Sequence, residues 1–175
     1  MMGEKQSSVP PRAVPASQAA ASVYCINTRY AVTFLIVFLL DRLTKAWALA
    51  SLARPIPVIG AFFALELRRN TGAAFSILTG QNVVLAVVAG IFVILTLFWQ
   101  RQVFFRQRLA AIALGMMAGG ALGNLIDRLL YGAVTDFIAF SFWPAFNVAD
   151  SCLVTGALLL VWCEWRGAKG RQGPR

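Results

Sequence analysis

The chain alternates between long apolar runs and short polar segments. Four runs have about the 20 residues that a helix needs to cross a bilayer, and they cover residues 30–50, 83–99, 109–131 and 148–165. The segments between them are richer in Gly, Pro, Arg and Asn, which is typical of the connections between spans. The pattern predicts an all-α membrane protein built as a four-transmembrane-helix bundle.

Composition supports this class, because 59% apolar and 13% charged residues fall outside the range of soluble domains. The mean hydropathy is +0.70, and 175 residues are too few for several domains. A tail rich in Pro, Ala and Ser precedes the first run, whose apolar core is too long for a secretory signal, so we expect a retained helix. The predicted organisation is a flexible cytoplasmic tail at 1–28, a transmembrane domain at 29–166 and a basic cytoplasmic tail at 167–175.

One segment between the first two runs has a different period. Residues 61–68 end in Leu65-Glu66-Leu67-Arg68, where apolar and charged positions alternate. This alternation predicts a short strand or hairpin outside the bilayer. The following Arg-Arg-Asn-Thr-Gly, residues 68–72, is typical of a turn that presents backbone and amide donors, although a plain turn would explain it equally well.

The net charge of +9 is distributed unevenly between the two sides of the predicted bundle. The side with both termini and the loop near residue 105 carries ten basic and two acidic residues, and the other side carries six basic and five acidic residues. The positive-inside rule therefore places both termini in the cytoplasm. We interpret the basic clusters as topology signals that touch anionic lipid, and we expect no nucleic-acid partner.

Several acidic residues on the predicted outer side have polar neighbours at helical spacing. Asp41 and Lys45 are four residues apart and therefore lie on one side of a helix. They form either an ion pair that shields both charges from lipid or a pair that orients an active site. Asn124, Asp127 and Arg128 share one face of the third run, and three polar groups there predict a face that lines a polar cleft. The neighbouring glycines indicate close helix packing.

Two further carboxylates lie at the ends of apolar segments, after a bend at Gly132. Asp136 precedes an aromatic run at 140–144 that suits the membrane interface, and Asn147 precedes the last helix as a candidate N-cap. Asp150 would lie in the first turn of that helix, where the helix dipole favours a carboxylate. Capping alone would explain Asp150, but a second acid at the same membrane level favours convergence of the two.

The chain lacks histidine, which excludes a Ser-His pair and a His-Glu-x-x-His zinc site. Cys25, Cys152 and Cys163 lack the spacing of a metal set and are interpreted as small packing residues, so we expect no cofactor or metal. Two carboxylates that share a proton could hydrolyse a peptide bond. A Ser-Lys dyad of Lys45 with Ser51 or Ser76, a proton-coupled transporter and a structural assembly factor remain alternatives.

Five ordered blocks then carry a family resemblance: Asp-Arg-Leu-Thr-Lys at 41–45, Asn-Thr-Gly-Ala-Ala-Phe at 70–75, Gly-Asn-Leu-Ile-Asp-Arg at 123–128, Val-Thr-Asp-Phe at 134–137 and Phe-Asn-Val-Ala-Asp at 146–150. Over roughly residues 31–165 the chain resembles lipoprotein signal peptidase, the bacterial type II signal peptidase. The resemblance implies an intramembrane aspartyl protease of the inner membrane, with four transmembrane helices, a small extracytoplasmic β-cradle and an active site on the periplasmic face. Its substrate would be a prolipoprotein, cut on the N-terminal side of a diacylglyceryl-modified cysteine.

The resemblance also assigns roles to individual residues. It makes Asp136 and Asp150 the catalytic dyad, places Asn70, Asn124, Arg128 and Asn147 around the substrate, and gives Asp41, Lys45, Gly72 and Asp127 supporting positions. It implies membrane lipid and cyclic-peptide inhibitors of the globomycin type as partners, and we expect a monomer. The tail before residue 29 is longer than this fold requires, and the segment between Asp136 and Asn147, where a flap over the dyad would lie, is short.

Overall fold

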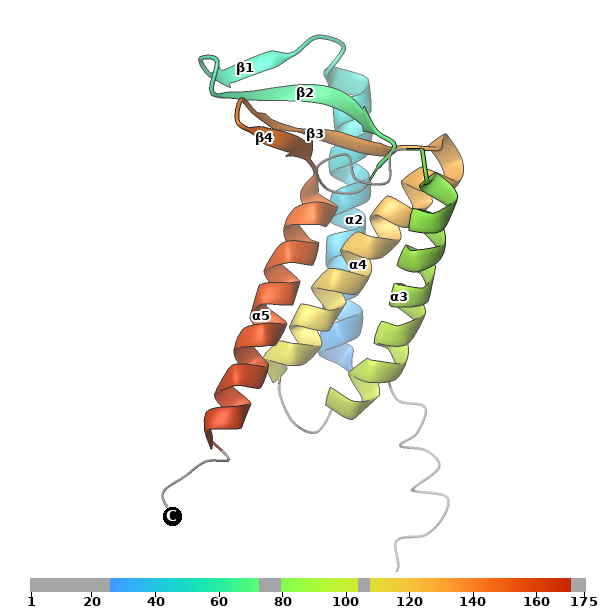
Figure 1. The fold of residues 1–175 in the computed structure, drawn as a ribbon, viewed down its shortest axis with the longest axis vertical. Coiled ribbons are helices and arrows are strands. Elements are labelled where there is room, and N and C mark those ends of the chain that lie inside the picture. Colours follow the sequence, from blue (N-terminus) through green and yellow to red (C-terminus); the bar gives the residue numbers. More distant parts are fainter. Residues whose placement is uncertain (1–25, 73–79, 104–107, 171–175) are drawn as a thin grey trace, which may run out of the picture.

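The computed structural model describes residues 26–72, 80–103 and 108–170, which form four long helices with a small sheet across one end (Figure 1). The helices are α2 (Thr28–Ser51), α3 (Asn82–Val103), α4 (Arg108–Tyr131) and α5 (Val148–Gly170). The strands are β1 (Ile56–Ile59), β2 (Phe63–Asn70), β3 (Val134–Phe140) and β4 (Trp143–Phe146). Each of the four apolar runs lies within one of these helices, so the predicted helices are confirmed.

Among the described residues, α3, α4 and α5 are long and apolar enough to cross a membrane. Helix α2 has 24 residues but carries Asp41, Arg42 and Lys45, so it is less apolar than the other three. Helix α5 continues to Gly170, so it extends into the predicted tail at 167–175. Residues 1–25 and 171–175 of the two predicted tails lie outside the described part of the chain.

Helix α4 lies at the centre of the bundle, against α2, α3 and α5 (Figure 1). Its small residues allow this close packing. A Cβ atom added at Gly119 would lie 2.6 Å from the carbonyl oxygen of Phe34 on α2, and one added at Gly120 would lie 2.6 Å from that of Ala149 on α5. Glycine is therefore required where the neighbouring backbones approach α4.

At the end of the bundle away from the sheet, buried polar groups join α2 to α3. The backbone N–H of Asn27 donates to Oε1 of Gln100 at 2.9 Å, and the hydroxyls of Tyr30 and Thr96 lie 3.0 Å apart. All four residues are at least 96% buried, so these bonds satisfy groups that would otherwise be costly to bury. They hold the first turn of α2 against α3.

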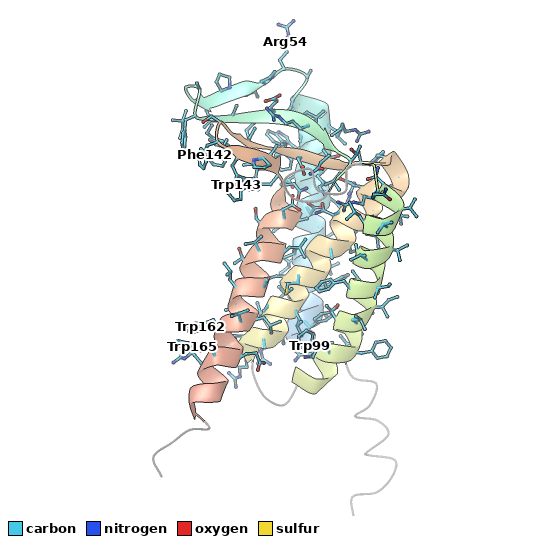
Figure 2. The ribbon with its side chains drawn as sticks, in the orientation of Figure 1. Arg54, Trp99, Phe142, Trp143, Trp162 and Trp165 are labelled. Carbon is cyan, nitrogen blue, oxygen red and sulfur yellow. The ribbon has the colours of Figure 1, made fainter. Side chains whose placement is uncertain are left out.

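The sheet is antiparallel, with the strand order β1-β2-β3-β4. The short strand or hairpin predicted at residues 61–68 is present as β2, which pairs with β1. The sequence pattern did not predict β3 and β4, and the aromatic run at 140–144 was interpreted only as interfacial. Figure 2 shows Phe142 and Trp143 beside the sheet, and Trp99, Trp162 and Trp165 near the opposite end of the bundle. Aromatic side chains at both ends of an apolar bundle are typical of a membrane protein.

Candidate active site

The site begins at the edge between the sheet and the helices, where β3 carries Asp136. Strand β3 pairs with β2 so that Asp136 lies opposite Arg68. Side chains alternate along a strand, and Val134 and Asp136 line a cavity of about 840 Å³, whereas the intervening Thr135 does not line it. The strand thus presents one carboxylate to the cavity.

Asp150 reaches the same cavity from the first turn of α5. The backbone N–H of Asp150 donates to Oδ1 of Asn147 at 2.9 Å, and the backbone N–H of Asn147 donates to Oδ2 of Asp150 at 3.2 Å. This reciprocal pair caps the helix as the sequence predicted. Capping and convergence are therefore both present, because one oxygen of Asp150 caps α5 while its carboxylate lines the cavity.

Asn147 connects the two carboxylates. Its Nδ2 donates to Oδ1 of Asp136 at 2.7 Å, while its backbone N–H holds Asp150. Asn70 donates from Nδ2 to Oδ2 of Asp136 at 2.9 Å, and Asn124 donates from Nδ2 to Oδ1 of Asp150 at 2.8 Å. Each of the four carboxylate oxygens therefore accepts one N–H bond, which fixes the orientation of both groups.

Burial and the neighbouring Asp150 carboxylate raise the pKa of Asp136 from 3.8 to about 6. The hydrogen bonds from Asn70 and Asn147 oppose this change, because they favour the charged form. A carboxyl with such a pKa is half protonated at about one pH unit below neutral, so both of its protonation states are accessible. This position suits a group that exchanges a proton during a reaction.

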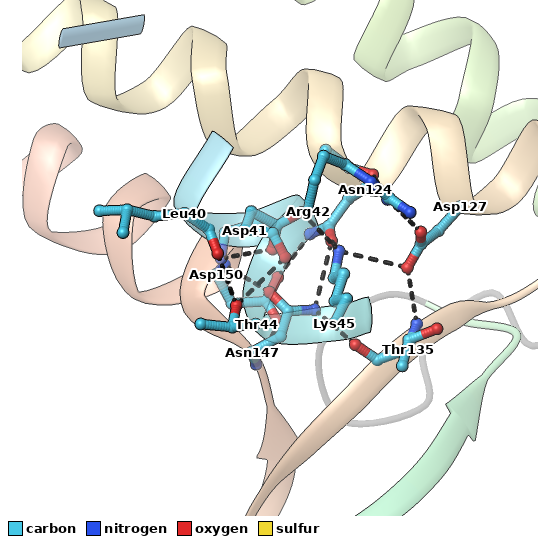
Figure 3. Close-up of polar contacts among 12 residues, drawn as sticks. Leu40, Asp41, Arg42, Thr44, Lys45, Asn124, Asp127, Thr135, Asn147 and Asp150 are labelled. Carbon is cyan, nitrogen blue, oxygen red and sulfur yellow. Dashed lines mark hydrogen bonds and ion pairs between the residues drawn. The ribbon is translucent and has the colours of Figure 1, made fainter. Parts of the chain in front are cut away.

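A buried cluster of charges surrounds the ammonium of Lys45 (Figure 3). The ammonium of Lys45 lies 2.9 Å from Oδ2 of Asp41, 3.2 Å from Oδ2 of Asp127 and 2.7 Å from Oδ1 of Asn124. Arg42 forms a second ion pair with Asp127. The predicted pair of Asp41 and Lys45 is confirmed and is part of a larger group of charges.

The remaining walls of the cavity differ in character. On one side, Nη2 of Arg128 donates to the carbonyl of Gly72 at 3.1 Å, and the N–H of Gly72 donates to Oδ1 of Asn70 at 2.9 Å. On the other side the wall is largely apolar and comes from β4 and α5: Trp143, Pro144, Ala145, Phe146, Leu153 and Val154. The cavity therefore combines polar groups at Asn70, Gly72 and Arg128 with a largely apolar wall.

The structure brings nearly all the predicted site residues to this place. Those that line the cavity are Asn70, Gly72, Asn124, Arg128, Asp136 and Asp150. Asp127 differs from the expected shared face, because its carboxylate is fully buried and bonds to Arg42, Lys45 and the N–H of Thr135 instead. The sequence reasoning did not identify Arg42 and Thr135, although both lie within the quoted blocks at 41–45 and 134–137.

The alternative chemistries gain no support among the described residues. No group of three His, Cys, Asp or Glu side chains there could hold a metal ion. The buried Lys45 ammonium contacts Asn124 and two aspartates, whereas Ser51 is exposed at the end of α2. Cys152 and Cys163 are free thiols, Cys163 within the bundle core, while Cys25 and Ser76 lie outside the part of the chain that is described.

Comparisons with known proteins agree with this geometry. The family described as Signal peptidase (SPase) II matches residues 33–166. A lipoprotein signal peptidase of Teredinibacter turnerae is 43% identical over 77% of this chain and 86% of its own length, and one of Polynucleobacter necessarius is 40% identical over 82% and 93%. A bacterial membrane enzyme solved by the in meso method superposes with a TM-score of 0.71 at 27% identity, covering 83% of this chain and 93% of its own. The chain belongs to the signal peptidase II family of membrane peptidases.

Proposed function

We propose that this protein is an intramembrane aspartyl endopeptidase that removes the signal peptide from diacylglyceryl-modified prolipoproteins. The observation that carries the proposal is the convergence of Asp136 from β3 and Asp150 from α5 in one cavity, with Asn147 bonded to both. Two carboxylates in one partly desolvated site can share a proton, which is the arrangement that aspartic proteases use. The relatives named lipoprotein signal peptidase support the substrate class.

In the mechanism, Asp136 holds the shared proton and Asp150 is ionised. Asp136 accepts bonds only from the neutral amides of Asn70 and Asn147, whereas Asp150 lies at the N-terminus of α5, where the helix dipole favours a negative charge. Asp150 removes a proton from water as the water oxygen attacks the scissile carbonyl carbon. Asp136 gives its proton to the carbonyl oxygen, and a tetrahedral diol forms.

The second half of the reaction returns both protons. Asp150 gives its proton to the amide nitrogen, the C–N bond breaks, and Asp136 recovers a proton from a hydroxyl of the diol. The acid–base part of such a reaction typically contributes about 10²-fold to 10⁴-fold in rate. The donors that hold Asp136 and Asp150 keep both groups in position throughout, so little reorganisation accompanies the charge movement.

The proposed membrane arrangement has four spans, including α2, with both termini in the cytoplasm of a bacterium and the sheet on the periplasmic side of the inner membrane. The charge distribution of the sequence supports this orientation. The charges of α2 that make it less apolar, Asp41 and Lys45, are completely buried against the other helices rather than exposed to lipid. The acyl chains of the substrate would stay in the bilayer beside the apolar wall of the cavity, and the cleavage site would reach the dyad laterally.

A single assay tests the proposal. Purified full-length protein in detergent is given a diacylglyceryl precursor and its unlipidated form, and cleavage is followed with Asp136→Asn and Asp150→Asn. Both variants are expected to fold and to lose cleavage, and only the lipidated precursor is expected to be cut. Glu164→Gln, an exposed acid near the far end of α5, is the matched control and should cleave normally. Normal turnover by either Asn variant would contradict the dyad.

A proton-coupled transporter and a structural assembly factor are the competing functions. Neither function predicts cleavage of a precursor by the unmodified protein, and a structural assembly factor would remain functional in Asp136→Asn. Membership of a peptidase family and the gathering of Asp136 and Asp150 in one cavity, instead of along the bundle, favour the protease.

A further inference from the structure

Three asparagine amides hold the two carboxylates, and each amide must present its nitrogen rather than its oxygen. The two ends of an amide have nearly the same shape, so a donor bound to Oδ1 is needed to decide the orientation. For Asn70 this donor is the backbone N–H of Gly72, and for Asn147 it is the backbone N–H of Asp150. Both are local bonds two or three residues along the chain.

Oδ1 of Asn124 instead receives its donors from side chains distant in the sequence, one of them on another helix. Its Oδ1 accepts from Nζ of Lys45 at 2.7 Å and from Nδ2 of Asn147 at 3.2 Å. An ammonium carries only donors, so Lys45 cannot face the amide nitrogen of Asn124. The nitrogen is therefore directed toward Asp150, at 2.8 Å from Oδ1.

The other two acceptors of Lys45 reach the backbone beside each catalytic residue (Figure 3). Asp41, paired with Lys45, accepts at Oδ1 the N–H of Ala149, the residue before Asp150, at 3.1 Å. Asp127, also paired with Lys45, accepts at Oδ2 the N–H of Thr135, the residue before Asp136, at 2.9 Å. One completely buried ammonium thus donates to Asn124 and forms ion pairs with Asp41 and Asp127, and each of these three side chains is bonded to a chain segment of the dyad.

From this geometry we infer that Lys45 is a positioning residue that sets the separation and orientation of the two carboxyl groups, through Asn124, Asp41 and Asp127. The inference rests on the proposed function, because it concerns the same pair of aspartates. The role goes beyond stabilising the fold. The start of α5 is bonded to Asp41 and strand β3 is bonded to Asp127, and Lys45 on α2 pairs with both of these aspartates.

A pH profile separates this role from simple stabilisation. The positive charge of Lys45 lowers the pKa of Asp136, so its removal is expected to shift the whole bell-shaped profile toward higher pH. The other titratable or charged groups near the dyad remain present in the variant: Asp41 on α2, Asp127 and Arg128 on α4, and Arg68 and Arg69 on β2, with Asp136 on β3 and Asp150 on α5 as the dyad itself.

The test compares Lys45→Met with Arg42→Met in the full-length protein. Arg42 is the second cation bonded to Asp127, but its other acceptor is the carbonyl of Gly123 rather than Asn124 or Asp41. Lys45→Met is expected to lower kcat per folded protein about 10-fold to 100-fold with KM within about twofold, and to shift the profile upward. Arg42→Met is expected to lower the melting temperature and to lower kcat less than Lys45→Met does, with the profile in place.

Two further variants keep the inference open to refutation. The double variant Lys45→Met with Asp41→Asn removes one positive and one negative charge, so the buried cluster keeps its net charge. If Lys45→Met alone does not fold, this double variant should show the loss of about 10-fold to 100-fold in kcat in its place. Lys45→Met added to Asn124→Ala should cost less kcat than it costs alone, because part of its action runs through Asn124.

Unchanged kcat for Lys45→Met, equal losses for the two cation variants without a pH shift, or failure of both Lys45 variants to fold would overturn the inference. The result for Asp150→Asn distinguishes this failure from failure of the proposed function. An inactive Asp150→Asn with a normal Lys45→Met would remove only the role of Lys45, whereas an active Asp150→Asn would remove the dyad.

Discussion

Replacing Gly123 with alanine places a methyl group against the most tightly held part of the site. The added Cβ would lie 2.9 Å from Cγ and 3.4 Å from Cβ of Asp41, with one carboxylate oxygen closer still. Distances under 3.0 Å are not tolerated between carbon atoms, so the Asp41 side chain would have to move. It is held by Lys45 and by the N–H of Ala149, so movement breaks at least one of these buried bonds.

The expected cost follows from two contributions. Overpacking a core by one methyl group costs about 1–3 kcal/mol, and breaking a buried ion pair outright costs about 3–5 kcal/mol. Because Asp41 can shift partly without losing its ion pair, the total cost is smaller than the sum of these two contributions. The free energy of unfolding is therefore expected to fall by about 2–4 kcal/mol. For a chain of this length that corresponds to a melting temperature about 5–15 °C lower.

Gly90→Ala is the matched control. Gly90 lies on α3, and a Cβ there would meet only Cδ2 of Leu125 at 3.9 Å, which is ordinary contact. Alanine also has the better helix propensity, so Gly90→Ala is expected to be neutral or to stabilise by up to about 1 kcal/mol. Tryptophan fluorescence during heating in detergent measures both variants. Equal melting temperatures for Gly123→Ala and wild type would refute the claim that Asp41 is rigidly held.

Three more predictions follow from other parts of the structure. The raised pKa of Asp136, about 6 in the folded protein against 3.8, means that its contribution to stability is present at pH 3 and is lost as pH rises through about 6. Relative to wild type, Asp136→Asn should therefore gain up to about 3 kcal/mol between pH 3 and pH 7 in denaturation experiments, and a constant difference would exclude the raised pKa. Gln100→Ala leaves the buried N–H of Asn27 without its partner, so thermal unfolding should show a loss of about 1–2 kcal/mol with unchanged activity per folded protein. Arg128→Ala removes the bond to the Gly72 carbonyl at the cavity wall and should raise KM about tenfold while the melting temperature changes little; an unchanged KM would make Arg128 structural.

The helices could be predicted because their signal is local. An apolar run of spanning length must form its backbone hydrogen bonds internally, so 83–99 and 109–131 could hardly be anything but helices. Strand β2 was found for a similar reason, since Leu65 to Arg68 alternate at period two. Strand β3 escaped prediction because five of its seven residues, Val134 and Phe137 among them, are buried, and they lie on both faces of the strand, which leaves no alternation to detect.

The candidate site was predictable as a set of residue types but not as a network. The order of the blocks identified Asp136, Asp150 and the three asparagines, and Asp41 with Lys45 could be paired from helical spacing alone. The contacts of Lys45 with Asn124 and Asp127 join residues about 80 positions apart. No local pattern encodes such contacts, because they depend on how α2 and α4 cross.

The sequence by itself determined the class of the protein, since apolar runs of fixed length and a one-sided charge distribution act through local hydrogen bonding and the membrane. It also determined the capping of α5, where Asn147 and Asp150 are three residues apart. Only the tertiary structure decided that Asp136 and Asp150 share one cavity, and that Asp127 turns away from it toward Lys45. The physical reason is that buried charges must find partners, and which partners lie within reach is fixed by the packing of α4 against its neighbours.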